Sequence, residues 1–119
     1  MDRLPTPDET RALIAPLDDL DRKVLGGLVA LWIAAPDRVR DREWTAEQFV
    51  HLATVAHGFA GDGPATTDDV ERIRTYAQRR LEALVRIAFA LFVRIADDLR
   101  PRGAEATFAD AQAAIARYL

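Results

Sequence analysis

Several reactive side chains are absent from this 119-residue sequence, and each absence excludes a class of chemistry. Cysteine and serine do not occur, which excludes disulfide bonds, thiol and serine nucleophiles and cysteine-ligated metals. Only two histidines are present, His51 and His57, and Lys23 is the only lysine. The basic residues are otherwise arginines and alanine is abundant, a composition typical of bacterial genomes rich in G and C.

Charge and hydropathy limit the surfaces that this chain can bind. The formal net charge is −3, so there is no strong overall attraction for nucleic acid or for an anionic membrane. The N-terminal segment lacks the apolar core of a secretory signal. The longest apolar stretch is interrupted by Arg86 and Arg94 and is too short to span a bilayer. We therefore expect a soluble cytoplasmic protein without a membrane partner.

Helical periodicity recurs along the chain, and no segment shows the sustained alternation of a strand. We expect an all-α helical bundle that forms a single domain over residues 1–119. Pro16, Pro36 and Pro101 should interrupt or follow helices, because proline does not fit a helix interior. The expected main helices cover about 17–35, 46–59 and 67–100, and short terminal helices cover about 7–15 and 108–118.

Threonine occurs where these helices should begin. Thr6 and Thr45 are each followed by an acid or amide three residues later, the pattern of a capping box. Thr66 or Thr67 should cap the long helix, and Thr107 should cap the last one. The sequence therefore predicts helix starts beside each of these residues.

The two longest helices carry apolar residues on a second side in their later halves. Phe89 and Val93 fall on the side of the long helix that is polar in its first half. Glycine within a helix costs about 1 kcal/mol relative to alanine, so we expect a neighbouring backbone to approach the pair at 26 and 27 closely. Since most soluble oligomers are symmetric homo-oligomers, we predict that a second copy covers this side. The predicted interface comprises Gly26, Val29, Ala30, Ile33, Phe89 and Val93. The alternative is that the short terminal helices cover this side within one chain.

A short segment after the third helix carries one of the two histidines. His57, Phe59 and Gly61 resemble the phosphorylated stretch of histidine-phosphotransfer domains, in which the histidine is followed by an apolar residue at +2, usually lysine at +3, and glycine at +4. Ala60 stands at the lysine position, and the glycines and proline at 61–64 should end a helix that continues in that family. The resemblance implies a helical bundle that accepts phosphate on His57.

Aromatic residues at helical spacing could also enclose a small molecule between the helices. His57, Tyr76 and Arg94 are the polar candidates for such a pocket. Arg94 has a second interpretation, in which its stem covers apolar neighbours and its charged end lies in water. The acidic pair Asp97 and Asp98 should find partners in Arg94 or in the arginines at 100 and 102.

Metal and nucleic-acid sites have little support in the residue spacing. His51 and His57 are six residues apart and point in different directions on a helix, so they do not bind one ion together. The arginines at 38–42 and 72–80 are interleaved with acids, which favours a solvated surface of mixed charge over a nucleic-acid surface. We expect no metal and no cofactor. The sequence favours a non-enzymatic interaction module that binds itself or another protein, with ligand binding and phosphotransfer as the alternatives.

Overall fold

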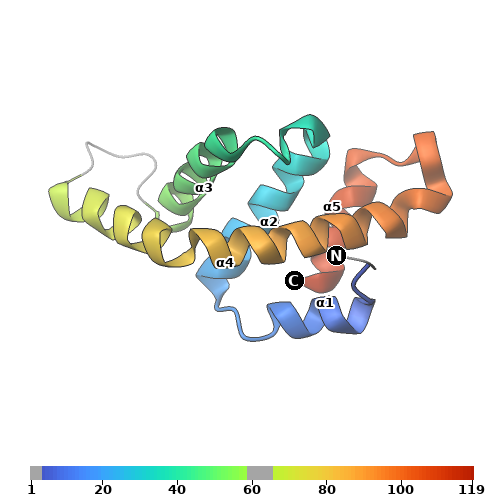
Figure 1. Ribbon diagram of the computed structural model, residues 1–119, viewed down its shortest axis with the longest axis horizontal. Helices are drawn as coiled ribbons and strands as arrows, with labels where there is room; N and C mark the ends of the chain where they lie inside the picture. Colours follow the sequence, from blue (N-terminus) through green and yellow to red (C-terminus); the bar gives the residue numbers. More distant parts are fainter. Residues whose placement is uncertain (1–3, 59–65) are drawn as a thin grey trace.

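The computed structural model describes residues 4–58 and 66–119, and every regular element within them is helical (Figure 1). The predicted all-α fold class is thereby confirmed, and α2, α3 and α4 form the main packed core. No helix in these two ranges is long and apolar enough to cross a bilayer. The elements are α1 (Pro7–Ile14), α2 (Asp19–Ala34), the 3-10 helix η1 (Pro36–Arg38), α3 (Arg42–Ala56), α4 (Thr67–Leu99), the 3-10 helix η2 (Arg100–Glu105) and α5 (Phe108–Tyr118).

Threonine caps begin three of the helices, as the sequence predicts. The Thr6 hydroxyl accepts a hydrogen bond from the backbone N–H of Glu9 at 3.1 Å. Thr66 caps α4 and Thr107 caps α5 in the same way. In each case the acid three residues on accepts from the backbone N–H of the threonine, so two otherwise unpaired amides are satisfied at each helix start.

The start of α3 corrects one of these predictions. Thr45 does not cap the helix, because α3 begins four residues earlier than the predicted start at 46. Asp41 is the cap, and its carboxylate accepts from the backbone N–H of Trp44 at 3.0 Å. Thr45 is instead buried within the first turns, where the Trp32 indole N–H donates to its hydroxyl at 3.4 Å. At the other end α3 stops at Ala56 rather than 59, since Gly58 follows with a positive φ of 79°.

Helix α4 runs the length of the molecule and organises the packing around it (Figure 1). Its 33 residues span about 50 Å, in agreement with a longest molecular extent of 48 Å. Helices α2 and α3 pack on one side of α4, and the buried side chains there include Trp32, Phe49, Leu84 and Leu91. Gly103, with a positive φ of 54°, lies in the turn after α4 that returns the chain as α5.

The two glycines within α2 allow two other elements to approach this helix. A Cβ atom on Gly26 would lie 2.9 Å from the Leu119 Cδ1 atom, and one on Gly27 would lie 2.6 Å from the Leu52 Cδ2 atom. Side chains from the C-terminal segment and from α3, rather than a backbone, therefore occupy the space that the missing Cβ atoms leave. Helix α5 of the same chain therefore covers the second apolar side of α2, the side that carries Gly26.

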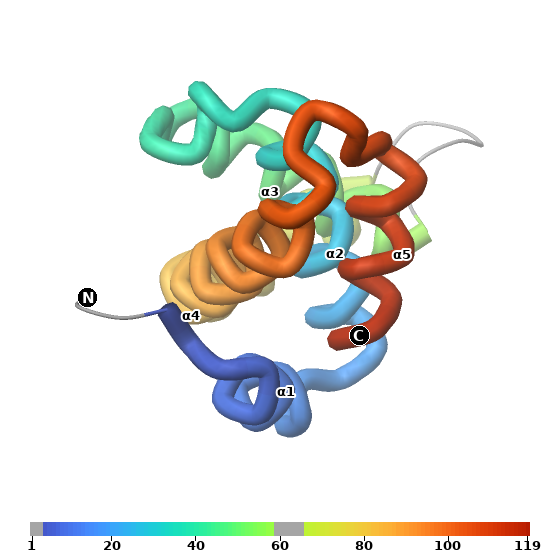
Figure 2. Tube along the Cα trace, turned by 90° about the vertical axis from the view of Figure 1, so that its right-hand side faces the viewer, coloured from blue at the N-terminus to red at the C-terminus, as the bar shows by residue number. Residues whose placement is uncertain are grey.

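One long face of α4 has no other described helix over it. Viewed along α4 in Figure 2, α2 and α5 lie to one side of it, α3 lies above and α1 below, and the remaining side is open. In the second half of α4, helical spacing places the exposed residues Glu82, Arg86, Phe89 and Ala96 on the side opposite the buried Leu84, Ala88, Leu91 and Ile95. The open face is thus the part of the long helix that this arrangement leaves to solvent.

Candidate functional site

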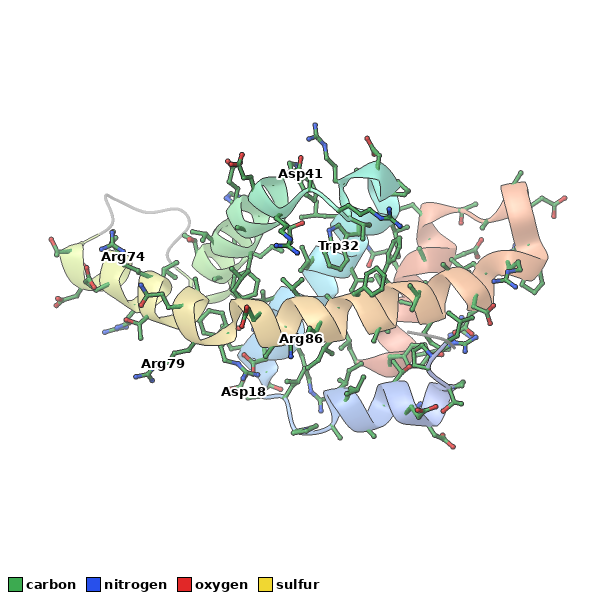
Figure 3. All side chains as sticks on the ribbon, viewed as in Figure 1. Asp18, Trp32, Asp41, Arg74, Arg79 and Arg86 are labelled. Carbon is green, nitrogen blue, oxygen red and sulfur yellow. The ribbon has the colours of Figure 1, made fainter. Side chains whose placement is uncertain are left out.

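The structure brings together two of the three residues predicted for a ligand pocket. His57 follows the last turn of α3, and its ring meets the Tyr76 ring of α4 edge to face, with centroids 5.2 Å apart. Tyr76 also stacks on Phe49, with centroids 5.8 Å apart. The remaining face of this cluster opens into a depression of about 640 Å³ between α4 and the start of α2. Figure 3 shows Asp18 and Arg79, which both line it, on the same side of the first half of α4.

A buried carboxylate, which the sequence analysis did not single out, organises the floor of this depression. The Asp21 side chain is only 10 % exposed, and it accepts hydrogen bonds from the Tyr76 hydroxyl at 2.8 Å and from the Arg80 guanidinium at 3.0 Å. Periodicity placed Asp21 in the first turn of α2, where the helix dipole alone would explain an acid. Asp21 also joins α2 to α4, and this contact depends on Tyr76 and Arg80, which lie 55 and 59 positions further along the sequence.

Burial raises the pKa of the Tyr76 phenol above its usual value of 10, and the hydrogen bond to Asp21 raises this pKa further. The pKa of Tyr118 is raised by the same two causes, burial first and then its hydrogen bond to Asp98. Both phenols are therefore held neutral in the folded chain, and these are its only two tyrosines.

This arrangement predicts a loss of stability at high pH. A phenol whose folded pKa is raised stabilises the fold fully below the unfolded pKa, near 10, and loses that contribution as the pH rises through the folded value. We expect tyrosinate absorbance to appear together with the loss of helical circular dichroism above about pH 10. In Tyr118→Phe the remaining absorbance should still appear with unfolding. An ordinary titration near pH 10 in a chain that stays folded would contradict this expectation.

Arg94, the third residue predicted for the pocket, is not part of this cluster. It lies 18 residues after Tyr76 on the same helix, a separation of about 27 Å. Its guanidinium forms ion pairs with Asp97 and Asp98 and donates to the Pro5 carbonyl oxygen at 2.9 Å. The side chain is only 11 % exposed, so its charged end does not lie in water as one interpretation predicted. Of the arginines predicted to pair with the acids at 97 and 98, Arg94 and Arg100 do so, whereas Arg102 pairs with Asp110.

The six residues of the predicted interface do not form one surface. Val29 is buried inside the chain, and the second side of α2 at Gly26 is covered by Leu119 and Ile115. Ala30 and Ile33 are half-buried against the core. The prediction of a joint surface on α2 and α4 is therefore wrong for its α2 half, because α5 packs there.

The α4 half of the predicted interface lies on the open face. Phe89 is 47 % exposed, and Val93 is half-buried one turn further on. Glu82 and Arg86 precede them at intervals that place residues on one helix face, and neither forms an ion pair with a described residue. Beyond Val93 lies a hollow of about 540 Å³, and its lining combines the apolar Leu4, Val93, Ala96 and Leu99 with the charged Asp97 and Arg100. An exposed aromatic ring, an adjacent apolar hollow and flanking charges thus occur together on this face.

The segment that resembles a histidine-phosphotransfer motif is only partly described. Phe59, Ala60 and Gly61 lie outside the described residues, as does the rest of the segment 61–64 that should keep the helix from continuing. His57 itself is half-buried at the C-terminal cap of α3, and its Nδ1 atom is 2.6 Å from the Ala53 carbonyl oxygen. The helix does not continue through the histidine, which is a further difference from the family pattern.

Comparisons with protein families, with curated proteins and with solved structures find no match for this chain. Its function must therefore be inferred from its own residues.

Proposed function

We propose that this protein is a small non-enzymatic interaction module that forms a homodimer through the open face of α4. The observation that carries the proposal is the exposure of Phe89. An exposed phenylalanine next to a half-buried valine and an apolar hollow is the arrangement of an anchor residue at a protein interface, where aromatic side chains supply much of the binding energy. A symmetric second copy is the commonest partner of such a surface.

The depression around Tyr76 gives less support for the alternative of a ligand-binding bundle. A specific ligand site usually presents polar groups that the ligand has yet to satisfy. Here the buried carboxylate of Asp21 already binds both Tyr76 and Arg80. Within the described residues, no buried side-chain nitrogen or oxygen lacks a hydrogen-bond partner. No group of three metal-ligating side chains occurs there either. The buried polar groups at the floor of the depression, Asp21 with Tyr76 and Arg80, therefore satisfy one another, which leaves the open face of α4 as the better basis for a function.

The proposal predicts that Phe89→Asp converts a dimer into a folded monomer. A carboxylate at the centre of an apolar contact must lose its hydration on association, and this cost is large compared with the energy of a small interface. Light scattering across about 1 to 100 µM, the affinity range of modest interfaces, should give twice the chain mass for wild type and the single mass for the variant. Circular dichroism should be unchanged, because the side chain is half exposed in the single chain.

Phe108→Asp is the matched control for this experiment. Phe108 is the first residue of α5 and is 54 % exposed, so the substitution has the same chemistry at a similar exposure but away from the α4 face. We expect Phe108→Asp to remain dimeric. A wild-type protein that stays monomeric throughout the concentration range, or a dimer that both variants retain, would refute the proposal.

A further inference from the structure

The outer residues of α4 repeat with the spacing of a helix–helix contact. Successive intervals of four, three, four, three and four residues separate them, which corresponds to the 3.5-residue repeat of a coiled-coil seam. All are exposed except the half-buried Val93. Arg100 extends the series beyond the last residue of α4, because its backbone remains right-handed helical. The series, called the outer seam below, consists of Glu82, Arg86, Phe89, Val93, Ala96 and Arg100.

The spacing of the outer-seam residues along α4 is symmetric about the level of Leu91. In an antiparallel pair of helices related by a two-fold axis, residues equally distant from the axis on opposite sides lie across from one another. Phe89 and Val93 are the two large apolar residues of the seam, and their midpoint is residue 91. An axis at this level therefore places Phe89 of each copy against Val93 of the other.

The charges of the outer seam agree with an axis at the level of Leu91, although Phe89 and Val93 alone define that axis. Glu82 and Arg100 both lie nine residues from position 91, about 13 Å along the helix. The same axis therefore brings Glu82 of one copy to Arg100 of the second, and this opposite-charge pair occurs twice in the dimer. Glu82 has no ion-pair partner among the described residues, and the Arg100 side chain is 76 % exposed while one of its nitrogens binds Asp97. Both side chains are thus accessible to a second copy.

The hollow beside Val93 fits the same arrangement. It begins one turn beyond Phe89 on the same face, and its lining includes Leu4, Val93 and Ala96 as well as the charged Asp97 and Arg100. With the axis at Leu91, Val93 at the near edge of the hollow lies opposite Phe89 of the other copy, and Ala96 and Arg100 lie opposite Arg86 and Glu82. The ring of Phe89, the apolar edge of the hollow at Val93 and the opposite charges further out make the surface complementary to itself, as a two-fold interface requires.

We infer that the partner of the outer seam is the same seam of a second copy, antiparallel, with the two-fold axis at the level of Leu91. The inference rests on the proposed function and specifies its geometry. Phe89 of each copy packs against Val93, at the edge of the hollow, of the other, and two Glu82–Arg100 pairs flank this apolar centre. The apolar contact supplies the affinity, and the charge pairs fix the register and the direction.

Charge reversal tests this register. In Glu82→Arg each new arginine faces Arg100 of the other copy, and in Arg100→Glu each new glutamate faces Glu82. Since two weak attractions are replaced by two repulsions, each homodimer should be weakened on the order of tenfold or more at low salt. In an equimolar mixture of the two single variants, the heterodimer contains only opposite-charge pairs at these positions. We therefore expect the heterodimer to form with the wild-type affinity. The double variant Glu82→Arg/Arg100→Glu should regain it as a homodimer.

The mixture separates an interface effect from damage to the fold. Sedimentation velocity at about 50 mM salt, where screening is modest, gives the affinities, and native mass spectrometry identifies the heterodimer. A destabilised chain would not be rescued by a second destabilised chain. Weaker single variants with rescue in the mixture support the inference. Unchanged single variants, or weakened variants without rescue, overturn it. If the register fails but the wild-type dimer is dissociated by Phe89→Asp, the proposed function still holds. If the wild-type protein is a monomer, the proposed function and the inferred register are both refuted.

Discussion

Trp32→Ala is expected to destabilise the fold by about 3 to 5 kcal/mol, the usual cost of removing a large buried aromatic side chain. Trp32 is almost fully buried and joins three helices. It lies on α2, its indole N–H donates to Thr45 of α3, and its ring meets the edge of Phe92 of α4 at a centroid distance of 6.0 Å. The substitution therefore leaves a cavity at the centre of the core. Since a domain is stable by about 5 to 15 kcal/mol, a large part of the total would be lost.

Urea unfolding followed by circular dichroism measures this loss, and Trp44→Ala provides the control. Trp44 is half-buried on α3 and contacts the Arg38 guanidinium 6.0 Å from its ring centre. The same chemical change should cost about 1 kcal/mol there, because less apolar area is lost and little cavity forms. Equal losses in the two variants would contradict the central position of Trp32.

Asp21→Ala should have the second largest effect, a destabilisation of about 2 to 3 kcal/mol. The change leaves the Tyr76 hydroxyl without its acceptor and the Arg80 guanidinium without its ion-pair partner. The magnitude lies below the usual cost of breaking a buried ion pair, because the Arg80 side chain is about one-third exposed and can regain water. The connection between α2 and the first half of α4 should loosen, so hydrogen exchange should accelerate there before it does in α5.

Asp19→Ala separates the buried network from the effect of the helix dipole. Asp19 is exposed and lies in the same first turn of α2, so its removal loses a comparable interaction with the dipole and nothing else. We expect it to cost no more than about 0.5 kcal/mol. Chemical denaturation of both variants at pH 7 gives the comparison. Similar losses in Asp19→Ala and Asp21→Ala would mean that the hydrogen bonds to Tyr76 and Arg80 contribute little.

The helix starts show how far local signals reach. The caps formed by Thr6, Thr66 and Thr107 could be predicted from the sequence, because a cap depends on residues within one helical turn. At the start of α3 two local signals compete, Asp41 and Thr45, and either one could cap a helix. In the fold Asp41 is the cap, and the Thr45 hydroxyl is buried and accepts a hydrogen bond from Trp32 instead. Residue 32 is 13 positions away, so no local pattern contained the answer.

The candidate sites show the same contrast between what local spacing determines and what helix packing determines. Periodicity correctly separated Phe89 and Val93 from the core stripe of α4, since a helical wheel fixes which residues share a face. It also placed Val29 on an uncovered face of α2, and there α5 supplies the cover. In the same way, His57 and Tyr76 meet whereas Arg94 lies far along the helix, because helix packing rather than residue type sets which faces meet.

The sequence by itself determined that this chain is helical, where most of its helices begin and end, and which residues line each helix face. These properties follow from hydrogen bonds and side-chain directions within a few residues. Only the tertiary structure decided that α5 covers α2 while the outer seam of α4 stays open, and that Asp21 reaches Tyr76 and Arg80. Burial depends on which faces meet across the chain, and a helix face presents the same residues whether another helix, a second copy or water lies against it.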